Sequence, residues 1–440
     1  MQTTFDAIII GAGPAGSTAA ILLASAGWSV ALIEKQHFPR RKVCGECLAA
    51  SNLSILDALG IGQAFRAAAG PDLQRVALLR SDRQVLARLP AAGVEGQRWG
   101  RALGRETLDT LLRDQAGAAG VTVLQPWAVQ AVNGGMGDWH IGVRAVESNT
   151  TLTLRAPVAI AANGSWEALP SDRPRRQLQR RAADLFAFKA NFHSAAQPEG
   201  LLSVLALDGG YGGMVLADGG ITTVACCVRR DRLEACRRAD PGLRAGEAVE
   251  AWLGRTCVGV HKVLTTAHRE GPWLAAGPLD PGIRLSAKDA MFRIGNAAGE
   301  AHPIVGEGMS MALQSAWLLS AQLLDRAGHK ALSHHGLASV TWQSEVAMHY
   351  ATAWRRQFVP RLRLAATFAH AAMRPASSAA LMAAAQMWPG LLTQGASWSG
   401  KTRGIIDSKT KTMQMPARPE PDQNAAKRED GAPTHTPSST

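Results

Sequence analysis

The 440-residue sequence predicts an α/β fold that holds an antiparallel sheet and ends in helices. Two glycine-rich turns, residues 11–16 and 295–308, each follow a strand-like apolar run and open a helix-like pattern. A strand, a turn and a helix in that order form the repeating unit of a parallel sheet. Between the turns, residues 180–290 alternate apolar and polar positions with the period of strands, and the pattern after residue 325 is helical.

The first unit begins with "DAIII", residues 6–10, a β-branched run typical of a buried parallel strand. The turn that follows opens a helix and has the form GxGxxG: Gly11, Ala12, Gly13, Pro14, Ala15 and Gly16. In such a turn Gly11 permits the tight bend, and Gly13 lets the backbone approach a pyrophosphate. Gly16 lets the helix and strand pack closely, so the unit predicts a Rossmann-like nucleotide site.

The second strand of this unit, residues 29–34, ends on Glu34. A carboxylate there can accept hydrogen bonds from both ribose hydroxyls of an adenosine and argues against a 2′-phosphate, which leaves FAD or NAD. The next segment, residues 37–50, is basic and then punctuated by glycine. Positive charge near a flavin stabilises its anionic reduced form, so this segment favours FAD. The contacts expected from this part of the chain come from Lys35, Arg41, Cys44 and Gly45.

Composition narrows the class of protein. Hydrophobic residues at 46% and charged residues at 19% are values of a globular chain. The 47 Lys and Arg against 35 Asp and Glu give a net charge of +12, spread over arginines throughout, which suggests anionic ligands or an acidic partner and not nucleic acid. Six cysteines in so long a chain predict no disulfide framework, and no metal site is expected. Without a signal peptide or a long uncharged apolar run, we expect a soluble cytoplasmic protein whose membrane contact, if any, is peripheral.

Four segments resemble, in the expected order, those of the para-hydroxybenzoate-hydroxylase-like FAD-dependent oxidoreductases, especially the branch of geranylgeranyl reductases and flavin-dependent halogenases. They are residues 11–16 with Glu34, "RKVCGE" at 41–46, "GRETLDTLLRDQA" at 104–116 and "GNAAGEAHPIVGEG" at 295–308. The resemblance spans residues 5 to about 325 and implies a glutathione-reductase-like FAD-binding domain with an inserted antiparallel-sheet substrate domain.

The expected domain division follows from the order of these segments. The FAD-binding domain would occupy residues 1–175 and return at 286–330, with the substrate domain at 176–285. Helices would fill residues 331–400. The polar stretch 401–440 has almost nothing to bury and is expected to be disordered.

The two glycine turns could serve two nucleotides or one. The resemblance implies one, because in that family the late turn returns to the same FAD. It implies that Asn296 touches ribityl or ribose hydroxyls and that Arg105 reaches a phosphate or ribose, although a purely structural role for Arg105 stays open. It places Pro303, Gly306 and Gly308 close to the isoalloxazine, with the helix from Met309 aimed at the flavin O2, where its dipole stabilises an anion.

The sequence departs from the family pattern at three places. Asn296 stands where the family usually has Asp, and Asn163 precedes Gly164 where the hydroxylases have Asp-Gly. The Trp-x-Trp-x-x-Pro signature of the halogenases is absent, which argues against halogenation. No second strand–GxGxxG–helix unit follows, so reduction would come from a transiently docked NAD(P)H, a partner reductase or the substrate itself.

The candidate catalytic residues are Tyr211, between two glycines, and His302, directly before Pro303. Tyr211 could donate a hydrogen bond to a substrate or pack on the sheet. His302 could act as general acid or base, orient the flavin edge or only pack. Glu307 is expected to cap the following helix. The Cys44-x-x-Cys47 pair could in principle relay electrons, but its segment already has an expected flavin role.

Residues 349–373 interleave four arginines with apolar residues. An amphipathic basic helix there could face an acidic carrier protein or anionic lipid, and the alternative is a solvated face on a capping helix.

The leading functional expectation is an FAD monooxygenase of secondary metabolism that uses O2 through a flavin C4a-hydroperoxide. Its small-molecule substrate would be aromatic, polyketide-like or lipid-like, free or tethered to a carrier protein. The alternatives are a flavin-dependent ene-reductase of the geranylgeranyl reductase type and, from another class, a non-catalytic flavin-binding or electron-carrier protein.

Overall fold

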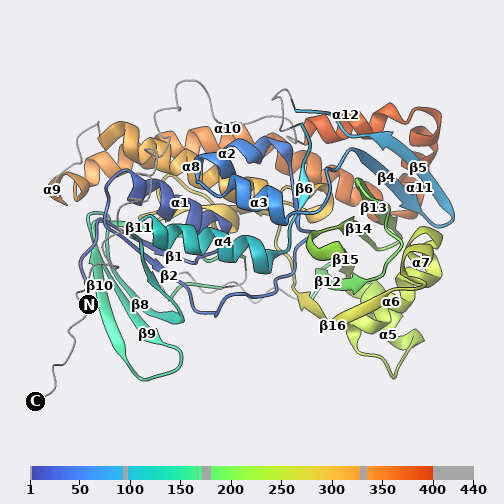
Figure 1. Ribbon diagram of the computed structural model, residues 1–440, viewed down its shortest axis with the longest axis horizontal. Helices are drawn as coiled ribbons and strands as arrows, with labels where there is room; N and C mark the ends of the chain where they lie inside the picture. The colour runs from blue at the N-terminus through green and yellow to red at the C-terminus, as the bar shows by residue number, and fades with distance from the viewer. Residues whose placement is uncertain (1, 93–97, 166, 171–179, 328–333, 400–440) are drawn as a thin grey trace, which may run out of the picture.

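The first strand lies in the middle of a five-stranded parallel sheet (Figure 1). The computed structural model of the chain describes residues 2–92, 98–165, 167–170, 180–327 and 334–399. In sheet order the strands are β18 (Phe292–Arg293), β11 (Val158–Ala161), β1 (Ala7–Ile10), β2 (Val30–Ile33) and β7 (Thr122–Leu124). Because β18 pairs in parallel with β11, the chain re-enters this sheet just before the second glycine-rich turn.

The two faces of this sheet bury alternate residues of β1. Ile9 packs in a core with three helices, and Ile8 packs on the opposite face with a three-stranded antiparallel sheet. The helices are α1 (Pro14–Ser25), α4 (Arg105–Ala118) and α8 (Gly308–Ala327). The strands of the small sheet are β8 (Trp127–Gly135), β9 (Asp138–Ala145) and β10 (Thr151–Ala156). Burial of both faces explains why β1, β2 and β11 are continuously apolar.

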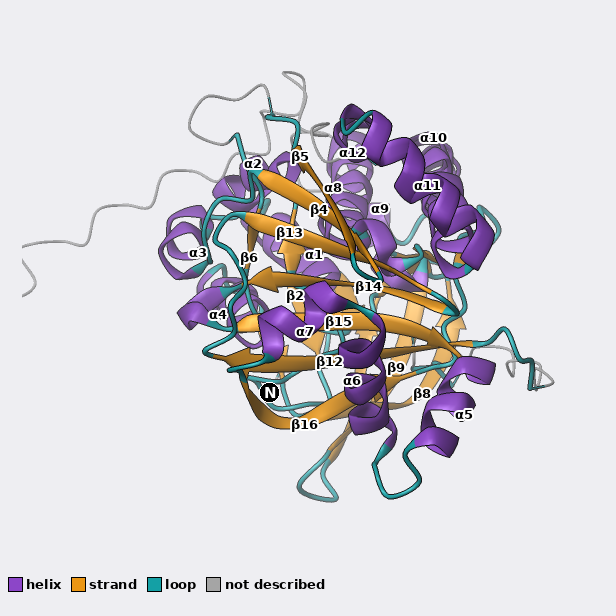
Figure 2. Cartoon of the chain, turned by 90° about the vertical axis from the view of Figure 1, so that its right-hand side faces the viewer, coloured by secondary structure: helices purple, strands orange, loops and turns teal. Residues whose placement is uncertain are grey.

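A second body is built on a seven-stranded sheet (Figure 2). Its strands, in sheet order, are β16 (His268–Ala276), β12 (Leu185–His193), β15 (Thr222–Arg229), β14 (Gly210–Leu216), β13 (Leu201–Leu207), β4 (Arg75–Arg80) and β5 (Arg83–Arg88). The antiparallel sheet predicted within residues 180–290 is therefore confirmed. The hairpin β4–β5 also belongs to this sheet, although it comes from the segment expected in the FAD-binding domain, and β4 pairs in parallel with β13.

Helices cover the outer face of this sheet. Phe188 and Phe192 of β12 pack against Trp252 and Val260, which lie on two of the covering helices. These are α5 (Arg230–Ala239), α6 (Ala245–Thr256) and α7 (Val258–Leu264). The remaining short elements are α2 (Leu53–Ala58), α3 (Gly62–Ala68), β3 (Cys47–Leu48), β6 (Arg101–Ala102), β17 (Gly282–Ile283) and β19 (Gly299–Glu300).

The C-terminal part is helical, as predicted. Its helices are α9 (His334–Leu337), α10 (Val340–Met373), α11 (Pro375–Met387) and α12 (Gly390–Trp398). The long helix α10 spans both bodies: Tyr350 Oη donates to the carbonyl of Arg293 beside the parallel sheet at 2.8 Å, and Met373 packs with residues of the seven-stranded sheet. The stretch expected to be disordered, 401–440, lies outside the described residues. Among the described helices, none is both long and apolar enough to cross a bilayer.

Candidate active site

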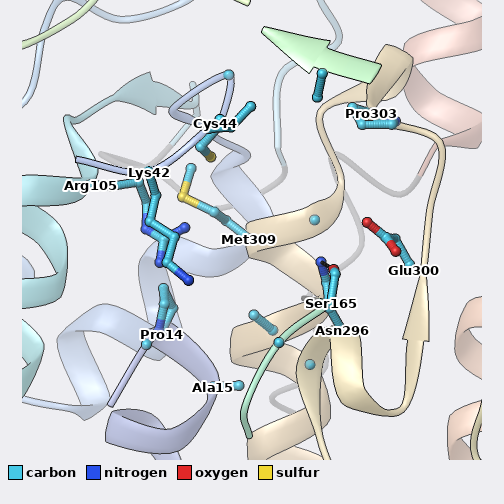
Figure 3. A pocket seen from close by; sticks show the side chains of 18 of the residues that line it. Pro14, Ala15, Lys42, Cys44, Arg105, Ser165, Asn296, Glu300, Pro303 and Met309 are labelled. Atoms are coloured by element: carbon cyan, nitrogen blue, oxygen red, sulfur yellow. Dashed lines mark hydrogen bonds between the residues drawn. The ribbon is translucent and has the colours of Figure 1, made fainter. Parts of the chain in front are cut away.

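A cavity of about 590 Å³ is lined by residues of both bodies. Most of the residues predicted for the site lie on its wall: Gly11, Gly13, Pro14, Ala15, Glu34, Lys35, Cys44, Gly45, Arg105, Tyr211, Asn296, Pro303, Gly306, Gly308 and Met309. Figure 3 shows how side chains from the first turn, the basic segment and the second turn surround the same space. Three predicted residues do not line it: Gly16, Arg41 and His302.

The glycines of the first turn have two distinct roles. Gly11 has φ +106°, and an added Cβ would lie 2.5 Å from the carbonyl oxygen of Ala162. A Cβ at Gly16 would lie 1.8 Å from the carbonyl oxygen of Gly11, so both positions must be glycine for the chain to pack. At Gly13 an added Cβ meets only Arg105 Nη2, at 3.7 Å. The space over Gly13 is therefore open cavity, as a bound pyrophosphate requires.

Cationic side chains converge next to this turn. Arg105, the first residue of α4, is held by Asp109 through two hydrogen bonds of 2.7 Å each. Arg40 is buried, and its Nε and Nη1 have no hydrogen-bond partner among the described residues. Burial and the charges of Arg40 and Arg105 lower the pKa of Lys42 to about 8. Buried donors without acceptors, and a lysine whose charged form is disfavoured by its neighbours, are suited to binding a polyanion such as a diphosphate.

Glu34 lies at the end of β2, where the sequence placed it. Its Oε2 accepts from the backbone N–H of Ala12 at 3.1 Å, and its Oε1 accepts from the backbone N–H of Gln36 at 3.0 Å. These bonds fix the carboxylate beside the first turn. Oε2 also accepts from Arg40 Nη2 at 3.4 Å. With about two acceptor positions on each oxygen, the position left open for a ribose hydroxyl is on Oε1.

The second glycine turn opens onto the same cavity. Gly295 and Gly306 both have positive φ, +58° and +65°. Asn296 Nδ2 donates to Ser165 Oγ at 2.8 Å, which joins the second turn to the segment after β11 (Figure 3). Helix α8 starts at Gly308, where an added Cβ would meet nothing within 4 Å. The positive end of the α8 dipole therefore faces free space on the cavity wall.

The other end of the cavity is formed by the inner face of the seven-stranded sheet and is largely apolar. Its wall includes Ala187, Leu202, Val204, Val215 and Leu279. Tyr211 also lies on this wall, and its Oη is 3.2 Å from His302 Nδ1. Burial raises the pKa of Tyr211 well above its usual range, with Cys227 adding to the shift. The phenol is therefore protonated at neutral pH.

His302 lies behind Tyr211 and not on the cavity wall. Burial, and then the nearby His370, lower the pKa of His302 to about 4. The two imidazole rings are 5.5 Å apart, centroid to centroid, and His370 is exposed. His302 is therefore neutral at neutral pH, and its Nδ1 contacts the hydroxyl of Tyr211, which lines the cavity.

Arg41 and Arg361 also point elsewhere than expected. Arg41 Nη1 donates to the carbonyl of Glu270 at 3.0 Å, on β16 and away from the cavity. Arg361 was expected on an exposed basic face of the 349–373 helix, and this is wrong. It is buried between α10 and α8, with Nη1 3.0 Å from Gln314 Oε1 and 3.5 Å from Glu307 Oε2.

Several residues on the wall are not among those predicted from the sequence. Arg40 and Lys42 come from the basic segment and line the cavity. Glu300 of β19 also lines it, and its Oε2 lies 3.0 Å from Arg284 Nη2. Glu46 is buried and ion-paired with Lys189 of β12. A lysine inside the apolar strand "DLFAFKANF" is the signal that could have revealed this pair.

Comparison with known proteins agrees with this arrangement. The model of the family described as FAD binding domain matches residues 4–336. Conditioned medium factor receptor 1 of Dictyostelium discoideum is 26% identical over 382 residues, which cover 76% of this chain and 66% of that protein. The chain thus matches just under two thirds of this relative's length, and less of the other curated relatives.

Solved structures show the same fold. The myxobacterial chondrochloren halogenase has a TM-score of 0.69 at 19% identity, and the alignment covers 94% of this chain and 96% of that one. A geranylgeranyl bacteriochlorophyll reductase-like protein from Thermoplasma acidophilum has a TM-score of 0.67 at 16% identity and covers 97% and 99%. The predicted fold class and the predicted superfamily are both confirmed.

Proposed function

Because the chain belongs to the FAD-binding-domain family, we propose that it is an FAD-dependent oxidoreductase with one cavity for cofactor and substrate. One observation carries the proposal. The glycine turns and the cations line one part of the cavity, and apolar side chains with Tyr211 line another. Such a cavity can hold a charged dinucleotide and an apolar molecule side by side.

The residues of the first part fit FAD. Arg40, Lys42 and Arg105 would bind the diphosphate over Gly13, and Glu34 would bind the adenosine ribose. Asn296 would bind ribityl hydroxyls, and the N-terminus of α8 would face the flavin ring. Once bound, FAD supplies two-electron transfer and, in its reduced form, reaction with O2.

The leading proposal for the reaction is monooxygenation of an apolar substrate. The apolar wall would exclude water, which protects oxygen chemistry from wasteful side reactions. Tyr211, protonated and on the wall, would donate a hydrogen bond to the substrate, and the neutral His302, with its proton on Nδ1, would donate in turn to the phenol oxygen at 3.2 Å. We further propose NAD(P)H as a transiently docked reductant.

A second candidate is reduction of a carbon–carbon double bond. The same protonated phenol favours it, because a hydride delivered to one alkene carbon must be matched by a proton delivered to the other. The geranylgeranyl reductase-like neighbour shares the fold of this chain, which supports this candidate.

Mixing experiments separate these candidates. The purified holoprotein is reduced without oxygen and then mixed with O2 while its absorbance is followed. A monooxygenase should show a transient spectrum that is neither that of reduced nor that of oxidised flavin, and Tyr211→Phe should retain this transient while losing product formation. Direct reoxidation by O2, together with anaerobic reoxidation by a polyprenyl alkene, would favour the reductase. A flavin that NAD(P)H never reduces and that reacts with neither would favour an electron carrier.

A further inference from the structure

Helices α11 and α12 form a surface of unusual composition. Residues 375–399 contain no Asp, Glu, Lys, Arg or His. Charged residues normally make up a large part of an exposed helix surface, because water solvates them best. An exposed pair of helices without any charge therefore indicates a surface that meets something other than water.

Part of the apolar surface of this helix pair is exposed. Ser378, Met382 and Ala385 of α11 are buried, while residues on its opposite side are exposed: Ala376, Ala379, Ala380, Ala383 and Met387. Met387, Trp388 and Trp398 are 89%, 52% and 63% exposed. In α12 no residue is buried. We name α11 and α12, residues 375–398, the uncharged helix pair.

Specific contacts fix the uncharged helix pair on the molecule. Arg80 of β4 donates from Nε to Ser378 Oγ at 2.9 Å and from Nη2 to the carbonyl of Pro375 at 3.2 Å. Thr393 Oγ1 of α12 donates to the carbonyl of Arg88 on β5 at 2.7 Å. Figures 1 and 2 both show α11 and α12 beside the β4–β5 edge of the seven-stranded sheet. The apolar face is thus presented by a fixed scaffold.

The chain that leads into the uncharged helix pair carries a net positive charge. Residues 346–399 contain no Asp or Glu. Arg356 and Arg363 are exposed on α10, and Arg374 is exposed at the start of α11. Tryptophan prefers the interface between lipid headgroups and hydrocarbon, and arginines near a bilayer surface attract anionic headgroups. The uncharged helix pair, preceded in the chain by exposed arginines, combines both features.

We propose that the uncharged helix pair docks peripherally on an anionic lipid bilayer, with Met387 and Trp398 entering the interface and the arginines contacting headgroups. The docked face lies behind the apolar end of the cavity, because Met373 and Met382 pack in one cluster with Tyr211 and Cys227. The docking rests on composition, exposure and charge, and it does not depend on which reaction the cavity supports.

Vesicle binding of the full-length holoprotein tests the proposal. The probes are vesicles of phosphatidylcholine alone and of phosphatidylcholine mixed with phosphatidylglycerol. Wild-type protein should co-sediment with the anionic vesicles, and added salt should weaken its binding. The double variant Met387→Ser/Trp398→Ser should bind about tenfold more weakly, because two interfacial side chains are lost.

A control uses apolar residues at the other end of α10 that are also more than half exposed. Val340 and Met348 are 55% and 53% exposed, and Val340→Ser/Met348→Ser should bind like wild type. FAD content and melting temperature should be unchanged in both double variants, which separates this outcome from failure of the proposed function. Absent binding to anionic vesicles, or equal binding of the two double variants, would overturn the proposal. So would a dimer in sedimentation that only Met387→Ser/Trp398→Ser dissociates, since the pair would then cover a second copy of the chain.

Discussion

At the scale of single residues, the glycines of the first turn separate binding from folding. Gly13→Val places its side chain in open cavity, so the protein should fold and melt near wild type but fail to hold FAD. Gly16→Val would drive a Cβ to 1.8 Å from the carbonyl oxygen of Gly11, so it should give little folded protein. The flavin-to-protein absorbance ratio and circular dichroism measure the two effects. Normal flavin content in a folded Gly13→Val protein would show that no pyrophosphate lies there.

The buried imidazole of His302 makes stability depend on pH. Its pKa is about 4 in the folded protein and 6.5 as the ordinary value, so the unfolded chain takes up the proton first as pH falls. The stabilisation is complete above about pH 6.5 and decreases toward pH 4, by roughly 3 kcal/mol for this group. His302→Gln should therefore flatten the fall of melting temperature across this window. An identical acid branch in the variant would show that other groups control it.

His302 should affect turnover through Tyr211 only. We expect His302→Ala to lower kcat by about tenfold to a hundredfold while FAD binding stays near wild type, since the imidazole does not line the cavity. Combining it with Tyr211→Phe should cost no more than Tyr211→Phe alone, because residues that act as one unit are not additive. Steady-state kinetics of the two single variants and the double variant measure this. Additive losses would mean that His302 acts independently of the phenol.

The role of a residue could be predicted from the sequence where a short local motif determines the backbone conformation. A GxGxxG turn between a strand and a helix fixes what each glycine does, and Gly11 and Gly16 behave as the sequence predicts. The basic segment is irregular, so no helical or strand period relates a residue's position in the sequence to the direction of its side chain. The sequence therefore could not tell that Arg40 and Lys42 face the cavity while Arg41 faces β16.

At the scale of elements, α10 carries a buried cation that supports the second turn. Arg361→Leu should lower the free energy of unfolding by about 3 kcal/mol, because Glu307 would keep its buried charge without this guanidinium. Arg363→Leu, two positions along the same helix and exposed, should change it by less than about 0.5 kcal/mol. Urea unfolding of both variants makes the comparison, and equal effects would contradict the assigned burial.

The positions of strands could be predicted from the period of their apolar residues. Which strands pair with one another could not always be predicted. The apolar alternation of residues 185–229 reveals four strands of the larger sheet. The pairing of β4 with β13 joins residues more than a hundred positions apart, for example Arg75 with Leu201. Such a contact depends on the tertiary fold, and nothing in the local pattern of residues 75–88 specifies it.

At the scale of the whole molecule, the chain leaves the parallel sheet after β11 and returns to it at β18. Between these strands it builds most of the seven-stranded sheet that forms the apolar wall of the cavity. The return brings the second glycine turn to the space that the first turn already borders. Two motifs almost 300 residues apart therefore line one cavity, and we infer that they share one FAD.

Titration of the apoprotein with FAD, followed by calorimetry, tests this claim most directly. Wild-type protein should bind one equivalent of FAD per chain. Gly308→Val, which changes only the second turn and has room for its Cβ, should fold normally and lose that same equivalent. Two equivalents of FAD, or a folded Gly308→Val protein that binds one equivalent as tightly as wild type, would contradict the single shared site.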